Sequence, residues 1–133
     1  MDLLLGSVRV AAGGPLDADA VWARYTRPAA WPGWAPHLRS VDYPHDVVRA
    51  GTAGRVTGVG GLVAVFRVDT VDEDERTWSW SVRSGPLRLR LEHGVEEDGA
   101  TGSTAWVRVH GPRPVVLAYA PLARWSLGRL VTA

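Results

Sequence analysis

Alternating apolar and polar side chains predict β-strands along most of the chain. The clearest alternation covers residues 76–84, where Trp78, Trp80 and Val82 share one face and serine or arginine occupies the other. Residues 87–95 continue it, with three leucines, His93 and Val95 on one face. The predicted strands cover residues 3–12, 38–43, 47–57, 62–71, 76–84, 87–95 and 104–110, and we expect the first to lie at an edge of the sheet.

Two segments are predicted to be helices instead. Residues 19–26 place Val21, Trp22 and Tyr25 on one face, and Asp17 or Asp19 can cap this helix by accepting hydrogen bonds from free backbone N–H groups. A second helix is expected at residues 115–130. Because a proline in a helix interior removes a hydrogen bond and costs about 3 kcal/mol, Pro121 predicts a kink at residues 117–121.

A tryptophan-rich turn at residues 28–34 follows the first predicted helix directly. It reads Pro-Ala-Ala-Trp-Pro-Gly-Trp, so that Trp31 and Trp34 flank a Pro-Gly pair. Tryptophan supplies a large apolar area with one polar N–H, and we therefore predict that this turn covers a pocket as a lid. Two roles stay open for Trp31 and Trp34, as plugs that fix a short second helix and as direct contacts with a ligand.

The order of these elements resembles the SRPBCC superfamily, which includes START domains, the birch-pollen-allergen fold and the polyketide cyclase/dehydrase-like proteins. The resemblance extends over nearly the whole chain and rests on Val21-Trp22, Trp31-Pro32-Gly33-Trp34, Gly51-Thr52, and Trp78-Ser79-Trp80 followed by Gly85-Pro86-Leu87. It implies an α+β helix-grip fold, a curved antiparallel β-sheet of about six or seven strands wrapped around a long C-terminal helix. Two short helices between strands 1 and 2 and an internal hydrophobic cavity complete this expectation.

Composition and charge narrow the classes of function. A chain of 133 residues fits one ligand-binding domain over residues 1–133, with enough length for a core and a cavity. The net charge of +1 lacks the basic excess typical of nucleic-acid and membrane-surface proteins. Lysine and cysteine are absent, which excludes Schiff-base, pyridoxal-phosphate and thiol chemistry.

Targeting signals and cofactor motifs are missing from the sequence. It has no basic n-region at its start, and no stretch reaches the roughly 18 apolar residues of a membrane span, so we expect a cytoplasmic protein without stable membrane insertion. His37, Asp42, His45 and Asp46 have no recognisable metal spacing, and no nucleotide signature occurs. We expect no metal, no cofactor and no nucleic-acid partner, and a monomer or homodimer.

The inward faces of the predicted sheet and last helix supply the candidate ligand contacts. Phe66 and Val68 have the parity expected to be inward. Trp80, nearer the middle of its strand, is the better candidate for the cavity, whereas Trp78 has the alternative of packing under the last helix. Tyr25, Tyr43 and Tyr119 can each place a hydroxyl at the cavity mouth. The candidate ligand-binding residues are Trp31, Trp34, Phe66, Trp78, Trp80, Leu89, Leu91, Trp106, Leu117 and Tyr119.

His93 is the most informative polar residue. It shares a face with Leu89, Leu91 and Val95, where an unpaired polar group is costly. Two roles are open for it. It is either a core histidine with its hydrogen bonds satisfied or an acid–base catalyst, because the charge of a histidine changes near neutral pH.

Residues 104–110 leave two orientations open. Their apolarity favours Ala105, Val107 and Val109 on the inward face, whereas the resemblance aligns Trp106, Arg108 and His110 inward. In the second orientation, Arg108 lies within reach of a molecule that also contacts His93. A buried arginine without a carboxylate partner would then suit an anionic or enolate-like ligand.

The resemblance implies two main functions for the cavity. One is an enzyme of the polyketide cyclase/aromatase/dehydratase type, with His93 as base and acid, Arg108 holding the oxyanion and tryptophans shaping the path of a polyketide-like substrate. The alternative is a non-catalytic carrier or sensor of a lipid, isoprenoid or quinone. A protein-interaction module is a third reading, but it would need a larger basic face. Polar groups converging inside the cavity would favour the enzyme.

Overall fold

Seven strands form one antiparallel sheet in the computed structural model, which describes residues 5–99 and 101–132. The strands lie in the order β1-β7-β6-β5-β4-β3-β2, so β1 is an edge strand as predicted. Residues 3 and 4 of the first predicted strand fall outside the described residues. The strands are β1 (Leu5–Gly14), β2 (Leu38–Asp42), β3 (Ala53–Gly58), β4 (Val63–Asp72), β5 (Thr77–Ser84), β6 (Leu87–Glu97) and β7 (Ser103–Pro112).

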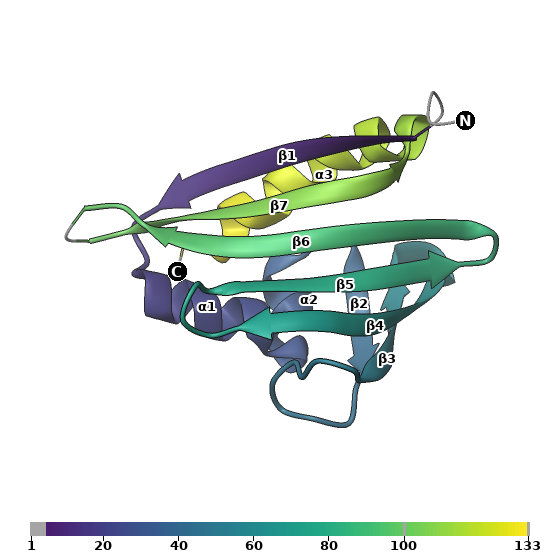
Figure 1. The fold of residues 1–133 in the computed structure, drawn as a ribbon, viewed down its shortest axis with the longest axis horizontal. Coiled ribbons are helices and arrows are strands. Elements are labelled where there is room, and N and C mark those ends of the chain that lie inside the picture. Colours follow the sequence, from purple (N-terminus) through teal and green to yellow (C-terminus); the bar gives the residue numbers. More distant parts are fainter. Residues whose placement is uncertain (1–4, 100, 133) are drawn as a thin grey trace.

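The helices lie together on one side of this sheet, which curves around them (Figure 1). Helix α1 (Ala18–Thr26), the 3-10 turn η2 (Pro28–Ala30) and helix α2 (Trp31–Trp34) connect β1 to β2, and the 3-10 turn η3 (Val59–Gly61) connects β3 to β4. Helix α3 (Arg113–Leu130) ends the chain and packs along β1 and β7. This is the predicted α+β arrangement of a curved sheet around a long C-terminal helix.

Helix boundaries follow from local chemistry. Asp17 Oδ1 accepts a hydrogen bond from the backbone N–H of Ala20 at 2.7 Å and thereby caps α1, which confirms one of the two predicted caps. Helix α3 begins next to Pro114, where a proline removes no intrahelical hydrogen bond. It then continues past Pro121 as one helix.

Strand β3 begins later than the apolar pattern predicts. Residues 47–52 form a loop instead of the first half of a strand. Val48 is buried in this loop, and its N–H donates to the carbonyl of Thr26 at the end of α1. Gly51 follows with a φ of 84°, a conformation that ends extended structure and that glycine adopts easily. Val48 therefore anchors a loop to α1.

The two faces of β7 are the ones that apolarity predicts. Ala105, Val107 and Val109 are buried beneath the helices. Trp106 lies on the outer face opposite Gly94 of β6, where the indole occupies space that any larger residue at position 94 would need. The orientation expected from the resemblance, with Trp106 inward, is therefore wrong.

Candidate functional site

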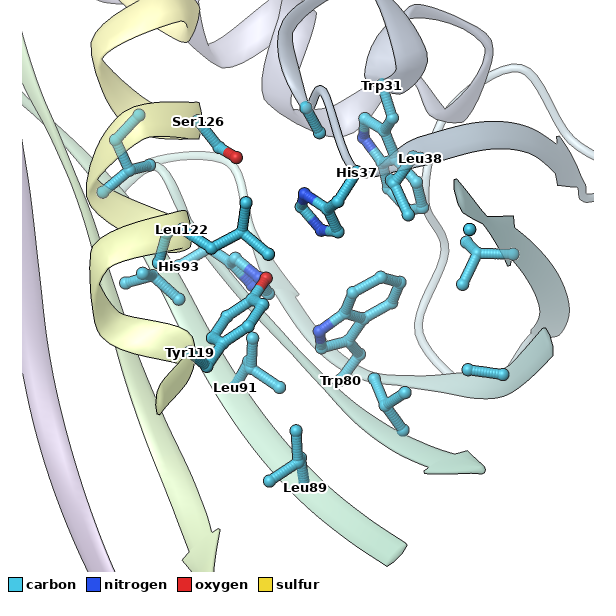
Figure 2. A pocket seen from close by; sticks show the side chains of 18 of the residues that line it. Trp31, His37, Leu38, Trp80, Leu89, Leu91, His93, Tyr119, Leu122 and Ser126 are labelled. Carbon is cyan, nitrogen blue, oxygen red and sulfur yellow. The ribbon is translucent and has the colours of Figure 1, made fainter. Parts of the chain in front are cut away.

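A cavity of about 360 Å³ lies between the concave face of the sheet, α2 and α3. This volume falls in the range of sites that bind small molecules, ~300–1,000 Å³. The described residues that line it are apolar, aromatic or neutral polar, together with two histidines, and they include no arginine, lysine, aspartate or glutamate. Figure 2 shows lining side chains around the open space and labels Trp31, His37, Leu38, Trp80, Leu89, Leu91, His93, Tyr119, Leu122 and Ser126.

The cavity reaches solvent beside η3. Val59 and Leu62 line it, and both side chains are exposed. Ser84 and Leu87, which flank the turn between β5 and β6, contribute to the same end of the lining. A ligand can therefore reach the interior between these two turns.

The tryptophan-rich turn forms the short helix α2 and closes the cavity on another side. Trp31 Nε1 donates to the carbonyl oxygen of Tyr25 at 2.9 Å, and Trp34 Nε1 donates to that of Arg24 at 3.3 Å. Both carbonyls belong to the last turn of α1, so the indoles fix α2 to α1. The same two side chains line the cavity. Trp31 and Trp34 therefore both fix the short helix α2 and form part of the cavity wall.

Strand β5 directs Trp78 and Trp80 toward the helices, because alternate residues of a strand share a face. Trp78 stacks on Trp31 with ring centroids 5.7 Å apart and planes 10° apart. Trp80 meets Trp31 edge-on at 5.1 Å and packs against Phe66 at 4.7 Å. Both tryptophans line the cavity, whereas Phe66 is buried behind it and does not.

His93 is buried on the inner face of β6, as its position in the alternation predicts. Its ring stacks on Trp78 at 3.9 Å, and its Nδ1 lies 3.1 Å from the carbonyl oxygen of Trp78. Since a carbonyl only accepts, Nδ1 carries the proton and donates it. Burial lowers the pKa of His93 to about 3, although the hydrogen bond to Trp78 acts in the opposite direction. The imidazole is therefore neutral at physiological pH.

Arg108 does not meet His93. It lies on the outer face of β7, paired in register with Glu92 of β6 and Arg9 of β1, and it does not line the cavity. Trp106 shares this outer face, where the Arg9 guanidinium lies 5.2 Å from the centre of its ring. Successive side chains of a strand point to opposite faces, and Val107 is buried on the inner face. Its neighbours Trp106 and Arg108 must therefore both point outward.

The remaining predicted ligand contacts lie on β6 and α3, and all but one of them line the cavity. Leu89, Leu91 and Tyr119 line the cavity, but Leu117 does not and is 59% exposed. Leu117 comes two residues before Tyr119, which places it about 200° around the helix, on the solvent side. Burial raises the pKa of Tyr119 to about 12, so its hydroxyl keeps its proton.

His37 and Ser126 also line the cavity, although sequence reasoning did not select them for it. His37 follows the lid by three residues and meets Tyr119 edge-on at 5.9 Å, and burial lowers the pKa of this imidazole. Ser126 lies seven residues after Tyr119, a spacing that puts both on one face of α3. That spacing could have identified Ser126 as a lining residue from the sequence, and the short distance in sequence between His37 and the lid could have identified His37.

The hydroxyls of the remaining two tyrosines have hydrogen-bond partners outside the cavity, although the ring of Tyr25 lines it. Tyr25 is fully buried, and its hydroxyl donates to the carbonyl of Trp106 at 2.9 Å; burial raises its pKa well above the usual value. Tyr43 exchanges a hydrogen bond with Thr52 at 2.6 Å in the loop before β3. Tyr119 is thus the tyrosine whose hydroxyl belongs to the cavity.

Residues 5–99 and 101–132 contain no group of three or more histidine, aspartate or glutamate side chains able to hold a metal ion. None of the helices in these ranges has both the length and the apolarity needed to cross a lipid bilayer.

Solved structures share this architecture at low sequence identity. An uncharacterized protein from Bacillus thuringiensis superimposes with a TM-score of 0.78 at 14% identity, covering 95% of this chain and 96% of that one. A hypothetical protein from Helicobacter pylori gives 0.77 at 14% identity, covering 96% and 85%. Ara h 8.0201, which has the birch-pollen-allergen fold, gives 0.69 at 15% identity, covering 95% and 97%. These similarities confirm the helix-grip fold.

Sequence comparison identifies the family. No curated protein matches the sequence significantly. The profile of the family described as "Polyketide cyclase / dehydrase and lipid transport" matches residues 7–133, nearly the whole chain. A mostly apolar cavity on the concave face of a helix-grip sheet agrees with the binding of a hydrophobic ligand in this family. The chain therefore belongs to the polyketide cyclase/dehydrase and lipid transport family of the SRPBCC superfamily.

Proposed function

We propose that this protein binds one small hydrophobic molecule in its cavity and holds it without chemical change, as a carrier or sensor. The observation that carries the proposal is the lining itself, which is mostly apolar and brings no carboxylate or guanidinium among the described residues to its histidines. Such a wall favours the transfer of an apolar molecule from water into the cavity. This transfer contributes roughly 25 cal/mol for each Å² of apolar surface that is buried.

The cyclase hypothesis receives less support in the form that uses His93 and Arg108. A general base works best with a pKa near the working pH, whereas burial lowers the pKa of His93 to about 3. Its Nδ1 is already committed to the Trp78 carbonyl. Arg108, the proposed oxyanion partner, lies on the far side of the sheet. We do not propose that this pair acts on a substrate.

A second candidate function, a cyclase or dehydratase, rests on a different group of side chains. His37, Tyr119 and Ser126 surround one part of the cavity (Figure 2). Nδ1 of His37 has no hydrogen-bond partner among the described residues and is free to exchange a proton with a ligand. Tyr119 would supply a neutral O–H donor to an oxyanion. The family description includes cyclases and dehydrases, so this candidate stays beside the first.

The test of binding is native mass spectrometry of the purified protein, followed by extraction and identification of any small molecule that it carries. The variant Ala123→Trp would place an indole in the cavity, since Ala123 is a buried lining residue of α3. We expect it to lose at least ~90% of the bound molecule, by simple exclusion of volume. Ala118→Trp on the exposed side of α3 is the matched control and should keep it.

The same extraction distinguishes the two candidates. A molecule recovered unchanged after incubation with the protein supports the carrier. A molecule converted to a cyclised or dehydrated product, at a rate that falls at least ~100-fold in His37→Asn, would establish the enzyme instead. If Ala123→Trp and Ala118→Trp carry the ligand equally, the cavity is not its site and the proposal fails.

A further inference from the structure

Four buried polar atoms of the described side chains have no hydrogen-bond partner: His37 Nδ1, Trp78 Nε1, Trp80 Nε1 and Ser126 Oγ. All four belong to residues that line the cavity. They come from three separate segments, the connection after α2, strand β5 and helix α3. Buried polar groups in folded proteins are almost always paired. Their concentration around one space indicates that a molecule in the cavity supplies the missing partners.

The other buried indoles show that the fold pairs such groups elsewhere. Trp22 Nε1 donates to Glu73 at 2.8 Å, Trp31 Nε1 to the Tyr25 carbonyl at 2.9 Å, and Trp34 Nε1 to the Arg24 carbonyl at 3.3 Å. Only the neighbouring tryptophans of β5, Trp78 and Trp80, keep a buried free N–H among the described residues. The unpaired donors are therefore specific to the cavity wall.

The chemistry of these groups limits the ligand. An indole N–H can donate but cannot accept, and a neutral phenol or serine hydroxyl can also donate. Trp80, His37, Tyr119 and Ser126 lie around the same open space (Figure 2). A ligand oxygen that accepts hydrogen bonds would satisfy one or two of these donors, whereas a pure hydrocarbon would leave all of them unpaired.

The absence of charge limits the ligand further. No arginine, lysine, aspartate or glutamate is found among the described lining residues. A carboxylate or ammonium group would therefore lose its hydration in the cavity without gaining a counter-charge, which is strongly unfavourable. A free fatty acid in its ionised form does not fit this wall.

We infer that the ligand is an uncharged carbonyl compound, of the ketone, ester or quinone class, whose oxygen accepts a hydrogen bond from Trp80 Nε1. The remaining apolar part of the molecule lies against Leu89, Leu91 and Leu122. This inference rests on the proposed binding function and names the class of molecule for that site.

Three probes of nearly equal shape test it by isothermal titration calorimetry of the ligand-free protein. They are methyl naphthyl ketone, the hydrocarbon in which a methylene group replaces the carbonyl oxygen, and the corresponding naphthoate. In a purely apolar cavity the hydrocarbon would bind best, because the ketone gives up hydrogen bonds to water. We expect the ketone instead to bind about tenfold more tightly than the hydrocarbon and more than tenfold more tightly than naphthoate.

The variant Trp80→Phe removes the N–H and keeps an aromatic ring in the wall. We expect it to abolish the advantage of the ketone while changing hydrocarbon affinity by less than about threefold. Trp125→Phe is the matched control, because Trp125 is 58% exposed on α3, and it should bind all three probes as the unmodified protein does.

Each outcome bears on a different claim. Preference for the hydrocarbon or for naphthoate, or a ketone preference that survives in Trp80→Phe, would overturn the inference and leave binding in the cavity intact. If no probe binds and the purified protein carries no extractable molecule, the proposed binding function fails and the inference fails with it.

Discussion

His93 is neutral because of what surrounds it. Trp78 stacks on one face of the imidazole at 3.9 Å, Tyr25 meets it edge-on at 5.2 Å, and a carbonyl oxygen takes the Nδ1 proton. None of these groups stabilises a positive charge as a carboxylate would. Burial, which disfavours the charged form of the imidazole, is therefore the dominant effect and lowers the pKa of His93 to about 3. At the scale of this residue, the wall of the cavity favours apolar contact over proton transfer.

A pH titration of stability tests this account of His93. The pKa is about 3 in the folded protein and about 6.5 in the unfolded chain. Above pH 6.5 the His93 imidazole is neutral in both the folded and the unfolded state, so the free energy of unfolding is not reduced by its protonation. Between pH 6.5 and 3 only the unfolded chain binds it, and the free energy of unfolding falls by about 1.4 kcal/mol per pH unit from this residue.

Urea denaturation of the unmodified protein and of His93→Gln, from pH 7 to 4.5, measures the contribution. Glutamine does not titrate and can still donate to the Trp78 carbonyl. The variant should be less stable at pH 7 but should lose roughly 2–3 kcal/mol less on acidification. Carboxylates and His37, whose pKa burial also lowers, titrate in both proteins and cancel in the comparison. Parallel curves would contradict a depressed pKa at His93.

Single residues differed in how far their positions could be predicted. The inward face of His93 followed from alternation within one strand, which needs no knowledge of neighbouring strands. Arg108 was uncertain because its strand has apolar residues on one face and Trp106 on the other. The place of Trp106 depends on Gly94, its partner on the neighbouring strand β6 and twelve positions earlier in the chain. Pairing of this kind between strands is not visible in the sequence.

The end of β1 packs closely against Val131, the residue that follows α3. A Cβ at Gly14 would lie 2.5 Å from the backbone oxygen of Val131 and 2.6 Å from its Cγ2. Two residues later the N–H of Leu16 donates to that same oxygen at 3.2 Å. The first strand is therefore fixed against the last helix at a point where only glycine fits.

Substituting the two adjacent glycines tests this contact. Gly14→Ala should destabilise the protein by about 1–3 kcal/mol, because the clash is with backbone and a buried side chain that have no room to move. Gly13→Ala is the matched control, since a Cβ there comes no closer than 3.4 Å to its neighbours. Thermal or urea unfolding measures both. Equal losses at the two positions would show that chain flexibility, rather than the contact, is responsible.

Most elements could be predicted, with limits that have a physical origin. Strand β5 and helix α1 were found from periodicity because each buries one regular face. Residues 47–52 looked like a strand because apolar side chains also anchor loops, as Val48 does beneath α1. The extent of α3 past Pro121 reflects tertiary packing, since the buried face from Val116 to Leu130 compensates for the hydrogen bond that proline removes.

At the scale of the whole molecule, the fold keeps about 360 Å³ of its interior unfilled. An empty cavity of this kind lowers stability, because its walls lose packing contacts and its polar groups lack partners. The outer face of the sheet offers a different environment, a shallow concave area bordered by Arg67, Arg83, Arg88 and Arg90. A neutral hydrophobic molecule therefore has a strong reason to prefer the inside.

Ligand-linked stability should report this preference. A molecule that binds only the folded state raises the free energy of unfolding by RT ln(1 + [L]/Kd), about 2.7 kcal/mol at one hundred times Kd. In a domain of this size that corresponds to a rise in Tm of roughly 10 °C. We expect methyl naphthyl ketone to produce it in the unmodified protein and in Ala118→Trp, as measured by differential scanning calorimetry. In Ala123→Trp the shift should vanish, because the indole takes the space of the ligand, whereas an undiminished shift there would move the binding site to the outer face.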